Sequence, residues 1–127
     1  MPILPVLPVS DVGAAIDHYV EQLGFKEEFR MPGDGGTPTD GQVSRGDNRI
    51  MFNLNSNDAS NGGGGVWLWI RIDGEDIDAF YRAIQQAPSL EIVEEIGDRF
   101  WGDRSFAIRD ALGYMLAFNA KIDRSDG

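Results

Sequence analysis

Two stretches of the chain have the hydrophobic period of an amphipathic helix. Apolar residues recur at intervals of three and four over residues 12–23 and again over residues 76–86. Asp11 precedes the first stretch and Gly24 follows it. An aspartate that can accept hydrogen bonds from free backbone N–H groups is a typical helix start, and a glycine is a typical helix end. The pattern therefore predicts one helix in each half of the chain.

Shorter apolar runs surround both predicted helices, and glycine, proline and polar residues separate them. Runs of this length and composition are typical of strands. In each half, one strand comes before the helix and three strands come after it. The predicted strands are residues 3–9, 25–31, 41–46 and 49–54 in the first half, and 66–72, 91–95, 104–109 and 114–119 in the second.

The two halves are related by an internal repeat. Val9 and Ile72 each end the strand before a helix and lie 72 − 9 = 63 positions apart. The segments that begin Arg45-Gly-Asp-Asn and Arg109-Asp-Ala-Leu lie 109 − 45 = 64 positions apart. Two similar offsets at independent places indicate tandem duplication of a βαβββ unit of roughly 60 residues. We therefore expect an α+β fold in one domain over residues 1–127, with module one about 1–60 and module two about 64–122.

Charge and composition narrow the possible functions. The chain has 127 residues, 21 acidic against 11 basic ones, and a net charge of −10. This charge repels nucleic acid and anionic membranes and favours a cationic small molecule. The absence of cysteine excludes disulfides, cysteine-bound metals and thiol nucleophiles. Because the first residues lack a basic leader and no apolar run is long enough to span a bilayer, we expect a cytoplasmic protein.

Several segments together resemble a known superfamily. They are Val-Ser-Asp-Val at residues 9–12, the Trp-Leu-Trp strand at 67–69, Phe-Trp-Gly at 100–102, and the stretch from Phe106 to Phe118. The chain resembles the vicinal-oxygen-chelate superfamily of glyoxalases, bleomycin-resistance proteins and dioxygenases, and it is most similar to the bleomycin-resistance proteins. One difference is that Asp-Ala-Leu-Gly stands at 110–113, where the family has Asp-Pro-x-Gly.

The resemblance implies two modules whose curved mixed sheets surround a cavity. It also implies a homodimer in which both subunits contribute to each cavity. Pro5 matches a proline at which the first strand of family members crosses to the partner subunit, so the resemblance implies that Pro5 belongs to a dimer arm. Alternatively, Pro5 lies in an edge strand, where its missing N–H is harmless.

Superfamily enzymes bind a divalent metal through His and Glu side chains on the first and last strands of each module. Counting along the strands places Leu4, Asn53, Trp67 and Ala117 at these four positions. None of these side chains is a good ligand for a divalent ion. The only histidine, His18, lies on the first predicted helix, where we expect it to be partly exposed. We therefore expect no metal, no cofactor and no catalytic residues.

Strand alternation identifies the candidate ligand-binding residues. It puts indoles, thioethers and one amide on the concave face, where they would suit a flat heteroaromatic group. The candidates are Met51, Asn53, Trp67, Trp69 and Met115, together with Trp101 in a loop at the rim. Alternatively, these side chains fill a closed core.

The functional hypothesis is a metal-independent protein that sequesters a cationic aromatic glycopeptide drug of the bleomycin family and so gives antibiotic resistance. Two alternatives stay open. One is a metal-dependent glyoxalase-like lyase or dioxygenase, and the other is a non-catalytic interaction module with a filled core. The four glycines at residues 62–65 are interpreted as a linker, because no Gly-Lys-Ser/Thr follows them as in a phosphate-binding loop.

Overall fold

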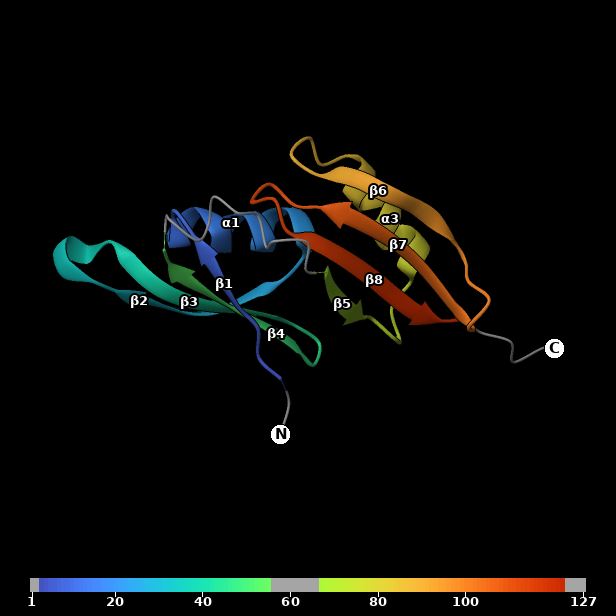
Figure 1. Cartoon of the computed structure of the whole chain (residues 1–127), viewed down its shortest axis with the longest axis horizontal. Coiled ribbons are helices and arrows are strands. Elements are labelled where there is room, and N and C mark those ends of the chain that lie inside the picture. Colours follow the sequence, from blue (N-terminus) through green and yellow to red (C-terminus); the bar gives the residue numbers. More distant parts are fainter. Residues whose placement is uncertain (1–2, 56–66, 123–127) are drawn as a thin grey trace. The chain divides into compact units, whose positions relative to one another are not determined.

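The structure is a computed structural model that describes residues 3–55 and 67–122. The glycine linker predicted at residues 62–65 lies outside the described residues. By its internal contacts the chain divides into two units, Met1–Gly64 and Gly65–Gly127 (Figure 1). Each unit contains one helix and one four-stranded sheet.

The first unit has its strands in the order β1-β4-β3-β2. Strand β1 is parallel to β4, and the other neighbours are antiparallel. A short 3-10 turn, Asp34–Gly36, lies between β2 and β3. The elements are β1 (Val6–Val9), α1 (Val12–Leu23), β2 (Lys26–Pro32), β3 (Pro38–Arg45) and β4 (Asn48–Leu54).

The second unit repeats this topology with the order β5-β8-β7-β6, again with its first strand parallel to its last. Both sheets are therefore mixed and open, and neither is a closed barrel. The predicted α+β fold of two tandem βαβββ units is confirmed. The elements are β5 (Trp67–Arg71), α3 (Ile77–Gln85), β6 (Glu91–Asp98), β7 (Asp103–Arg109) and β8 (Met115–Lys121).

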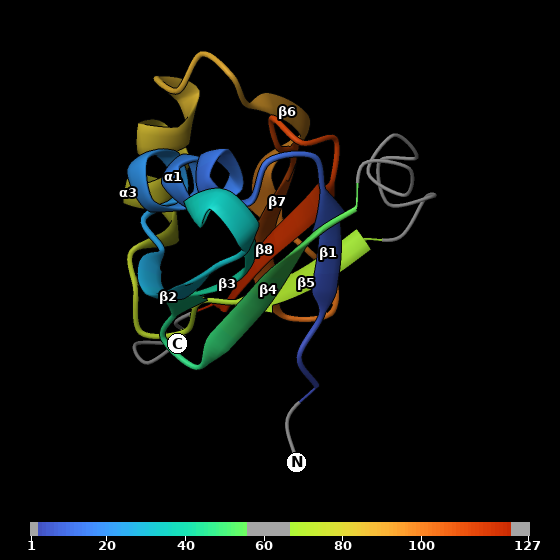
Figure 2. The ribbon, with the colours of Figure 1, turned by 90° about the vertical axis from the view of Figure 1, so that its left-hand side faces the viewer.

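Helix α1 closes one face of the first sheet (Figure 2). Asp11 caps the helix by accepting a hydrogen bond from the Ala14 N–H at 3.0 Å. The helix buries Tyr19 completely, and its ring meets that of Phe52 on β4 edge-on at 5.0 Å. This apolar contact fixes the helix against the sheet, and no other described element of the unit covers the opposite face.

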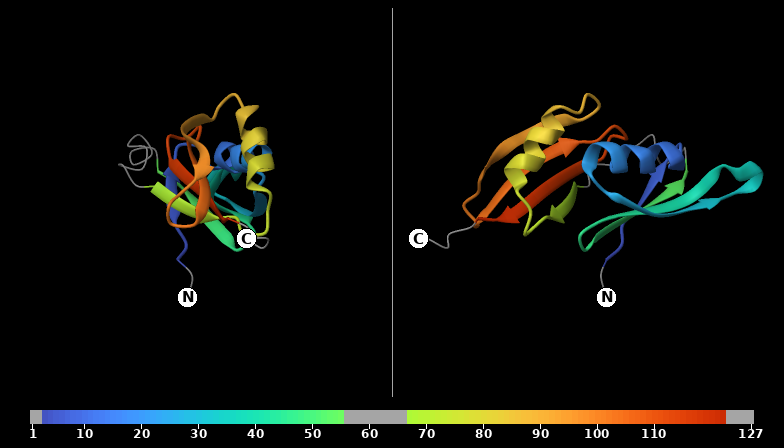
Figure 3. Two further views of the ribbon diagram at one scale, coloured as in Figure 1. Left: turned by 90° about the vertical axis from the view of Figure 1, so that its right-hand side faces the viewer. Right: turned by 180° about the vertical axis from the view of Figure 1, so that it is seen from behind.

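Helix α3 covers one face of the second sheet in the same way (Figure 3). Asp76 caps it by accepting from the Ala79 N–H at 3.1 Å. The Phe80 ring lies 5.8 Å from that of Phe106 on β7 and 4.9 Å from that of Phe118 on β8. Since the helix occupies one face, any ligand of this unit must use the other.

Two local expectations are corrected by the structure. Strand β1 starts at Val6 rather than at residue 3, because the nitrogen of Pro5 cannot donate to a ladder. His18, expected to be partly exposed, is buried at 9% exposure, and its ring packs edge-on against Tyr19 at 5.6 Å. Among the described residues, no helix is long and apolar enough to cross a membrane.

Candidate functional site

The second unit contains a pocket of about 290 Å³ on the sheet face that α3 does not cover. Three tryptophans and one glutamate are among the six residues that line it. Trp67, Trp69 and Trp101 are 44%, 56% and 48% exposed, so a large part of each indole is available to a ligand. The lining residues are Trp67, Trp69, Glu94, Trp101, Ser105 and Ala117.

Strand β5 places two of the indoles. Side chains alternate along a strand, so Trp67 and Trp69 share one face, while Ile70 points to the buried face and is 4% exposed. The parallel register sets Trp67 beside Met115 and Trp69 beside Ala117 on β8. Because Ala117 is small, it leaves space beside Trp69.

The turn between β6 and β7 places the third indole. The Arg99 N–H donates to the Asp103 carbonyl at 2.7 Å, and the Gly102 N–H donates to the Arg99 carbonyl at 3.1 Å. Gly102 has a φ of 96°, a left-handed conformation that favours glycine. The turn holds Trp101 with its ring 6.1 Å from that of Trp69, at an interplanar angle of 46°.

A β-bulge brings Glu94 to the pocket. Ile92 pairs with Ile108, but the next pair along β6 is Glu94 with Ala107, so the register shifts between them. The extra residue on β6 moves Glu94 to the uncovered face of the sheet. Within residues 3–55 and 67–122, the Glu94 carboxylate forms no hydrogen bond or ion pair.

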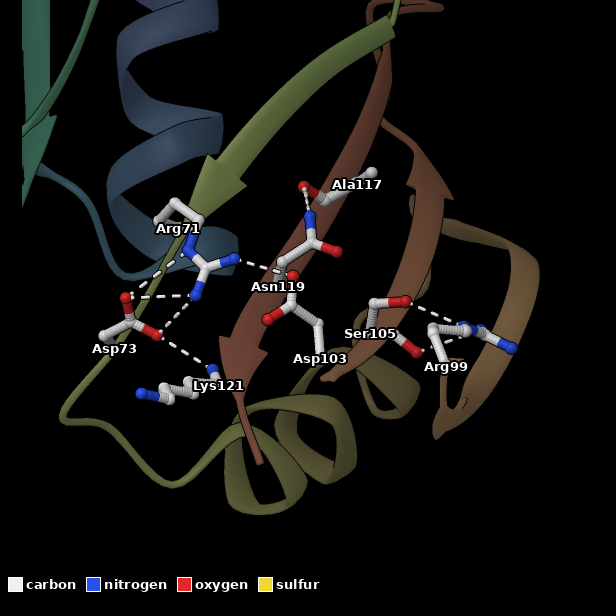
Figure 4. A network of polar contacts seen from close by, with 8 residues as sticks. All are labelled: Arg71, Asp73, Arg99, Asp103, Ser105, Ala117, Asn119 and Lys121. Atoms are coloured by element: carbon white, nitrogen blue, oxygen red, sulfur yellow. Dashed lines mark hydrogen bonds and ion pairs between the residues drawn. The ribbon is translucent and has the colours of Figure 1, made fainter. Parts of the chain in front are cut away.

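The polar end of the pocket is formed by Ser105. Arg99 donates from Nε to Ser105 Oγ at 2.8 Å and from its terminal nitrogen to the Ser105 backbone carbonyl at 3.0 Å (Figure 4). The same nitrogen donates to the backbone carbonyl of Glu95 at 2.9 Å. These bonds hold the guanidinium against the strand and the turn. Arg99 is thus fixed behind Ser105 and is not itself a wall of the pocket.

Asn119 lies opposite Ser105 in the register of β7 and β8 and is fully buried. Its Nδ2 donates to the Ala117 carbonyl at 3.1 Å, which leaves Oδ1 pointing toward the side of β7 (Figure 4). No described residue donates a hydrogen bond to this oxygen. An unsatisfied buried acceptor of this kind costs about 1–3 kcal/mol.

An ion-pair network lies at the other end of β5. Arg71 donates to Asp103 at 2.7 Å and to Asp73 at 3.0 Å (Figure 4). The hydrogen bonds to Asp73 and Asp103 raise the pKa of the Arg71 guanidinium. The backbone N–H of Lys121, and then Arg71, lower the pKa of Asp73. Because Arg71 is paired with both Asp73 and Asp103, we interpret this network as stabilising the ends of the strands and not as a ligand site.

The sequence-predicted residues fall into two groups. Trp67, Trp69 and Trp101 line the pocket, and Met115 lies beside Trp67 with 9% exposure, outside the lining. The other candidates belong to the first unit. There Met51 and Asn53 lie half-buried on the uncovered face of β4, with Asn53 Nδ2 donating to Asp40 Oδ1 at 3.3 Å, and Pro5 precedes β1.

Sequence reasoning missed Glu94, did not count Ser105 as a ligand contact, and did not consider Asn119. The carboxylate of Glu94 is the larger omission, because it gives the pocket a charge.

The residues do not fit the metal centre of superfamily enzymes. In the first unit the register sets Pro8 beside Asn53, and Leu4 lies before the strand. In the second unit it sets Trp69 beside Ala117. Neither pair contains a histidine or a carboxylate, and the single neutral amide of Asn53 is a poor ligand for a divalent ion. Among the described residues, no three histidine, aspartate or glutamate side chains gather as metal ligands.

Known proteins share this architecture. The family model of the glyoxalase/bleomycin resistance protein/dioxygenase superfamily matches residues 3–118. The bleomycin-binding protein of the bleomycin producer Streptomyces verticillus, solved with copper(II)-bleomycin, has a TM-score of 0.71 and 27% identity, covering 96% of this chain and 97% of that one. TioX from Micromonospora sp. ML1 has a TM-score of 0.74 and 23% identity, covering 96% and 99%. An uncharacterized Mycobacterium bovis protein is 29% identical over 126 residues, covering 93% of this chain and 82% of that protein.

Proposed function

Because this chain belongs to the glyoxalase/bleomycin resistance protein/dioxygenase superfamily, we propose that it is a metal-independent binding protein that sequesters a cationic aromatic drug of the bleomycin type. The observation that carries the proposal is the pocket walled by Trp67, Trp69 and Trp101. The likeness to a bleomycin-binding protein over nearly the whole chain supports it.

The indole geometry suits a flat ring. A ring held between two parallel indoles needs about 7 Å between their centroids, twice the optimal contact distance of roughly 3.5 Å. The Trp69 and Trp101 centroids are 6.1 Å apart and tilted by 46°. A flat heteroaromatic ring therefore enters after an outward swing of Trp101 by about 1 Å, or it stacks on the open face of Trp69 alone. A turn residue such as Trp101 can make this movement at low cost.

Charge and assembly complete the proposal. A net charge of −10 attracts the cationic tail of such a drug and accelerates capture. We propose a homodimer with Pro5 in its arm, in which both subunits contribute to each cavity and Met51 and Asn53 are among the ligand-binding residues. The protein works in the cytoplasm, where it holds the drug away from its target. Size-exclusion chromatography with light scattering is expected to give twice the 14.0 kDa mass of the chain.

Binding without turnover is the defining feature of this function. Isothermal titration with metal-free and with copper(II)-bleomycin is expected to show stoichiometric binding, and mass spectrometry is expected to recover the drug unmodified. No binding at high micromolar drug concentration overturns the bleomycin assignment. Modified drug, or one tightly held divalent metal per chain, favours the lyase or dioxygenase alternative.

A further inference from the structure

The indole pocket carries a negative charge that stacking alone does not require. Its lining includes three indoles, whose π faces carry a partial negative charge, and Glu94, whose side chain ends in a carboxylate. None of the described residues that line it has a cationic side chain. An indole face attracts a cation within about 6 Å of its centre, and the attraction strengthens as water is removed. A positive group inside this pocket therefore meets attractive partners on several sides.

Glu94 differs from Glu91 and Asp98, the two acidic residues of β6 that are held in ion pairs. On the same strand, Glu91 accepts from Arg109 at 3.1 Å and Asp98 accepts from Arg104 at 3.0 Å. Glu94 forms no such pair in the described part of the chain. A neutral ligand that covers this carboxylate removes its bound water without forming a compensating interaction, which costs free energy. A cation replaces the lost hydration with an attractive contact between opposite charges. The unpaired carboxylate thus penalises neutral ligands.

We propose that this pocket prefers a flat ring that itself carries a permanent positive charge, an N-alkylated heteroaromatic cation held by Trp67, Trp69, Trp101 and Glu94, over a neutral ring of the same shape. This inference rests on the proposed function and names the chemical class of the group that the pocket takes. Arg99, bound to Ser105 and to the Glu95 carbonyl, sets the orientation. Its charge repels the positive ring atom from the Ser105 end and directs it toward Glu94.

The size of the pocket supports a fused bicyclic ring. At about 290 Å³ it lies at the lower end of the range for small-molecule sites. It accommodates a bicyclic ring but not a complete glycopeptide. The remainder of any larger ligand lies outside the pocket, so a ring-sized probe is enough to test its charge preference.

Two methylated probes with the same number of heavy atoms separate charge from shape. N-methylquinolinium is a permanent cation, and 2-methylquinoline has the same ring and methyl group but is uncharged in a suitably alkaline buffer. Isothermal titration of both with the full chain at constant ionic strength is expected to show the cation binding about tenfold more tightly, as several exposed cation–π contacts predict. The expected dissociation constants are about 0.1–5 mM, given the usual binding energy per atom of small ligands.

Glu94→Gln is expected to reduce this preference by about threefold or more, with the affinity for 2-methylquinoline unchanged or improved. Glu95→Gln is the matched control, because it removes the same charge one residue away on a side chain that does not line the pocket. It is expected to keep the wild-type preference within about twofold.

Equal affinities for the two probes overturn the inference and leave the proposed drug binding standing. So does an equal loss in the Glu94 and Glu95 variants, because the preference would then come from the net charge of the protein. If neither probe binds at about 5 mM, the inference is wrong, and the bleomycin titration decides separately on the proposed function.

Discussion

Removing the indole of Trp69 tests the proposed site most directly. This side chain is 56% exposed, which corresponds to about 140 Å² of an indole side chain of about 250 Å². A ring stacked on one face covers about half of that area, worth about 1.8 kcal/mol at 25 cal/mol per Å². Stacking adds about 0.5–1.5 kcal/mol. We therefore expect Trp69→Ala to weaken bleomycin binding by about 2–3 kcal/mol, or about 30- to 150-fold.

Titration calorimetry suits this test, because the substitution itself changes the tryptophan emission. Stopped-flow measurements should place most of the loss in the dissociation rate, since stacking acts on the bound state. Trp69→Phe keeps a ring at the same position and is expected to lose less than about tenfold. The melting temperature controls for folding, and a small change is expected because Trp69 lies on the exposed face of an edge strand. An affinity within threefold of wild type in Trp69→Ala refutes stacking at this wall.

Four further outcomes are expected. Rising salt should lower the association rate constant of bleomycin and leave its dissociation rate constant nearly unchanged, because salt screens charges over about 8 Å at physiological ionic strength. An equal effect on both rate constants contradicts long-range electrostatic attraction of the drug. Arg104 lowers the pKa of Asp78 from 3.8, so this pair stabilises the fold above that pH and its contribution disappears as the pH falls through the lowered pKa. In urea titrations, Asp78→Asn should have an unfolding free energy about 0.5 kcal/mol below that of the wild type at neutral pH, a value reduced because the pair is partly exposed to solvent. This difference should vanish in acid. A difference that does not change with pH argues against the ion pair. The added methyl group in Gly41→Ala meets the Ile16 side chain of α1 and should lower the unfolding free energy by about 1–3 kcal/mol; an unchanged value means that the helix yields. Asn119→Leu removes an amide oxygen without a partner and should change stability by less than about 1 kcal/mol, whereas Asn119→Ala leaves a cavity and should cost about 2 kcal/mol or more; equal losses show that the amide itself stabilises the fold.

The helices were predictable because their signals are local. Asp11 and Gly24 stand next to the turns that they cap, and the apolar period follows from helix geometry alone. The start of β1 is also a local matter, since Pro5 lacks the N–H that a longer strand needs there. The burial of His18 is not local. It depends on how α1 lies against its sheet, which the helix sequence alone does not specify.

Glu94 could not be found by strand alternation. A regular strand sets Glu94 on the same face as Ile92, which pairs with Ile108 on the helix-covered side. A register shift of one residue exchanges the faces of every side chain beyond it. The bulge arises from the pairing of β6 with β7, which is known only once both strands are in place. Glu94 therefore reads from the sequence as one more solvated carboxylate.

Asn119 shows a second kind of limit. Alternation along β8 places it on the same face as Ala117, so its face was accessible to sequence reasoning. The hydrogen bonds of the Asn119 amide could not be predicted from the sequence. They depend on the Ala117 carbonyl two residues away and on which groups of β7 face the amide. An unsatisfied acceptor is a property of the assembled sheet and has no signature in the sequence.

The duplicated framework separates fold from function in this chain. Val6 and Pro8 lie beside Met51 and Asn53 in the first unit, just as Trp67 and Trp69 lie beside Met115 and Ala117 in the second. The two sheets therefore offer equivalent positions, but the second carries indoles where the first carries small apolar side chains. These positions lie on the uncovered face of an edge strand, where substitution leaves the core against the helix intact. The choice of ligand can therefore change at these positions while the fold stays the same.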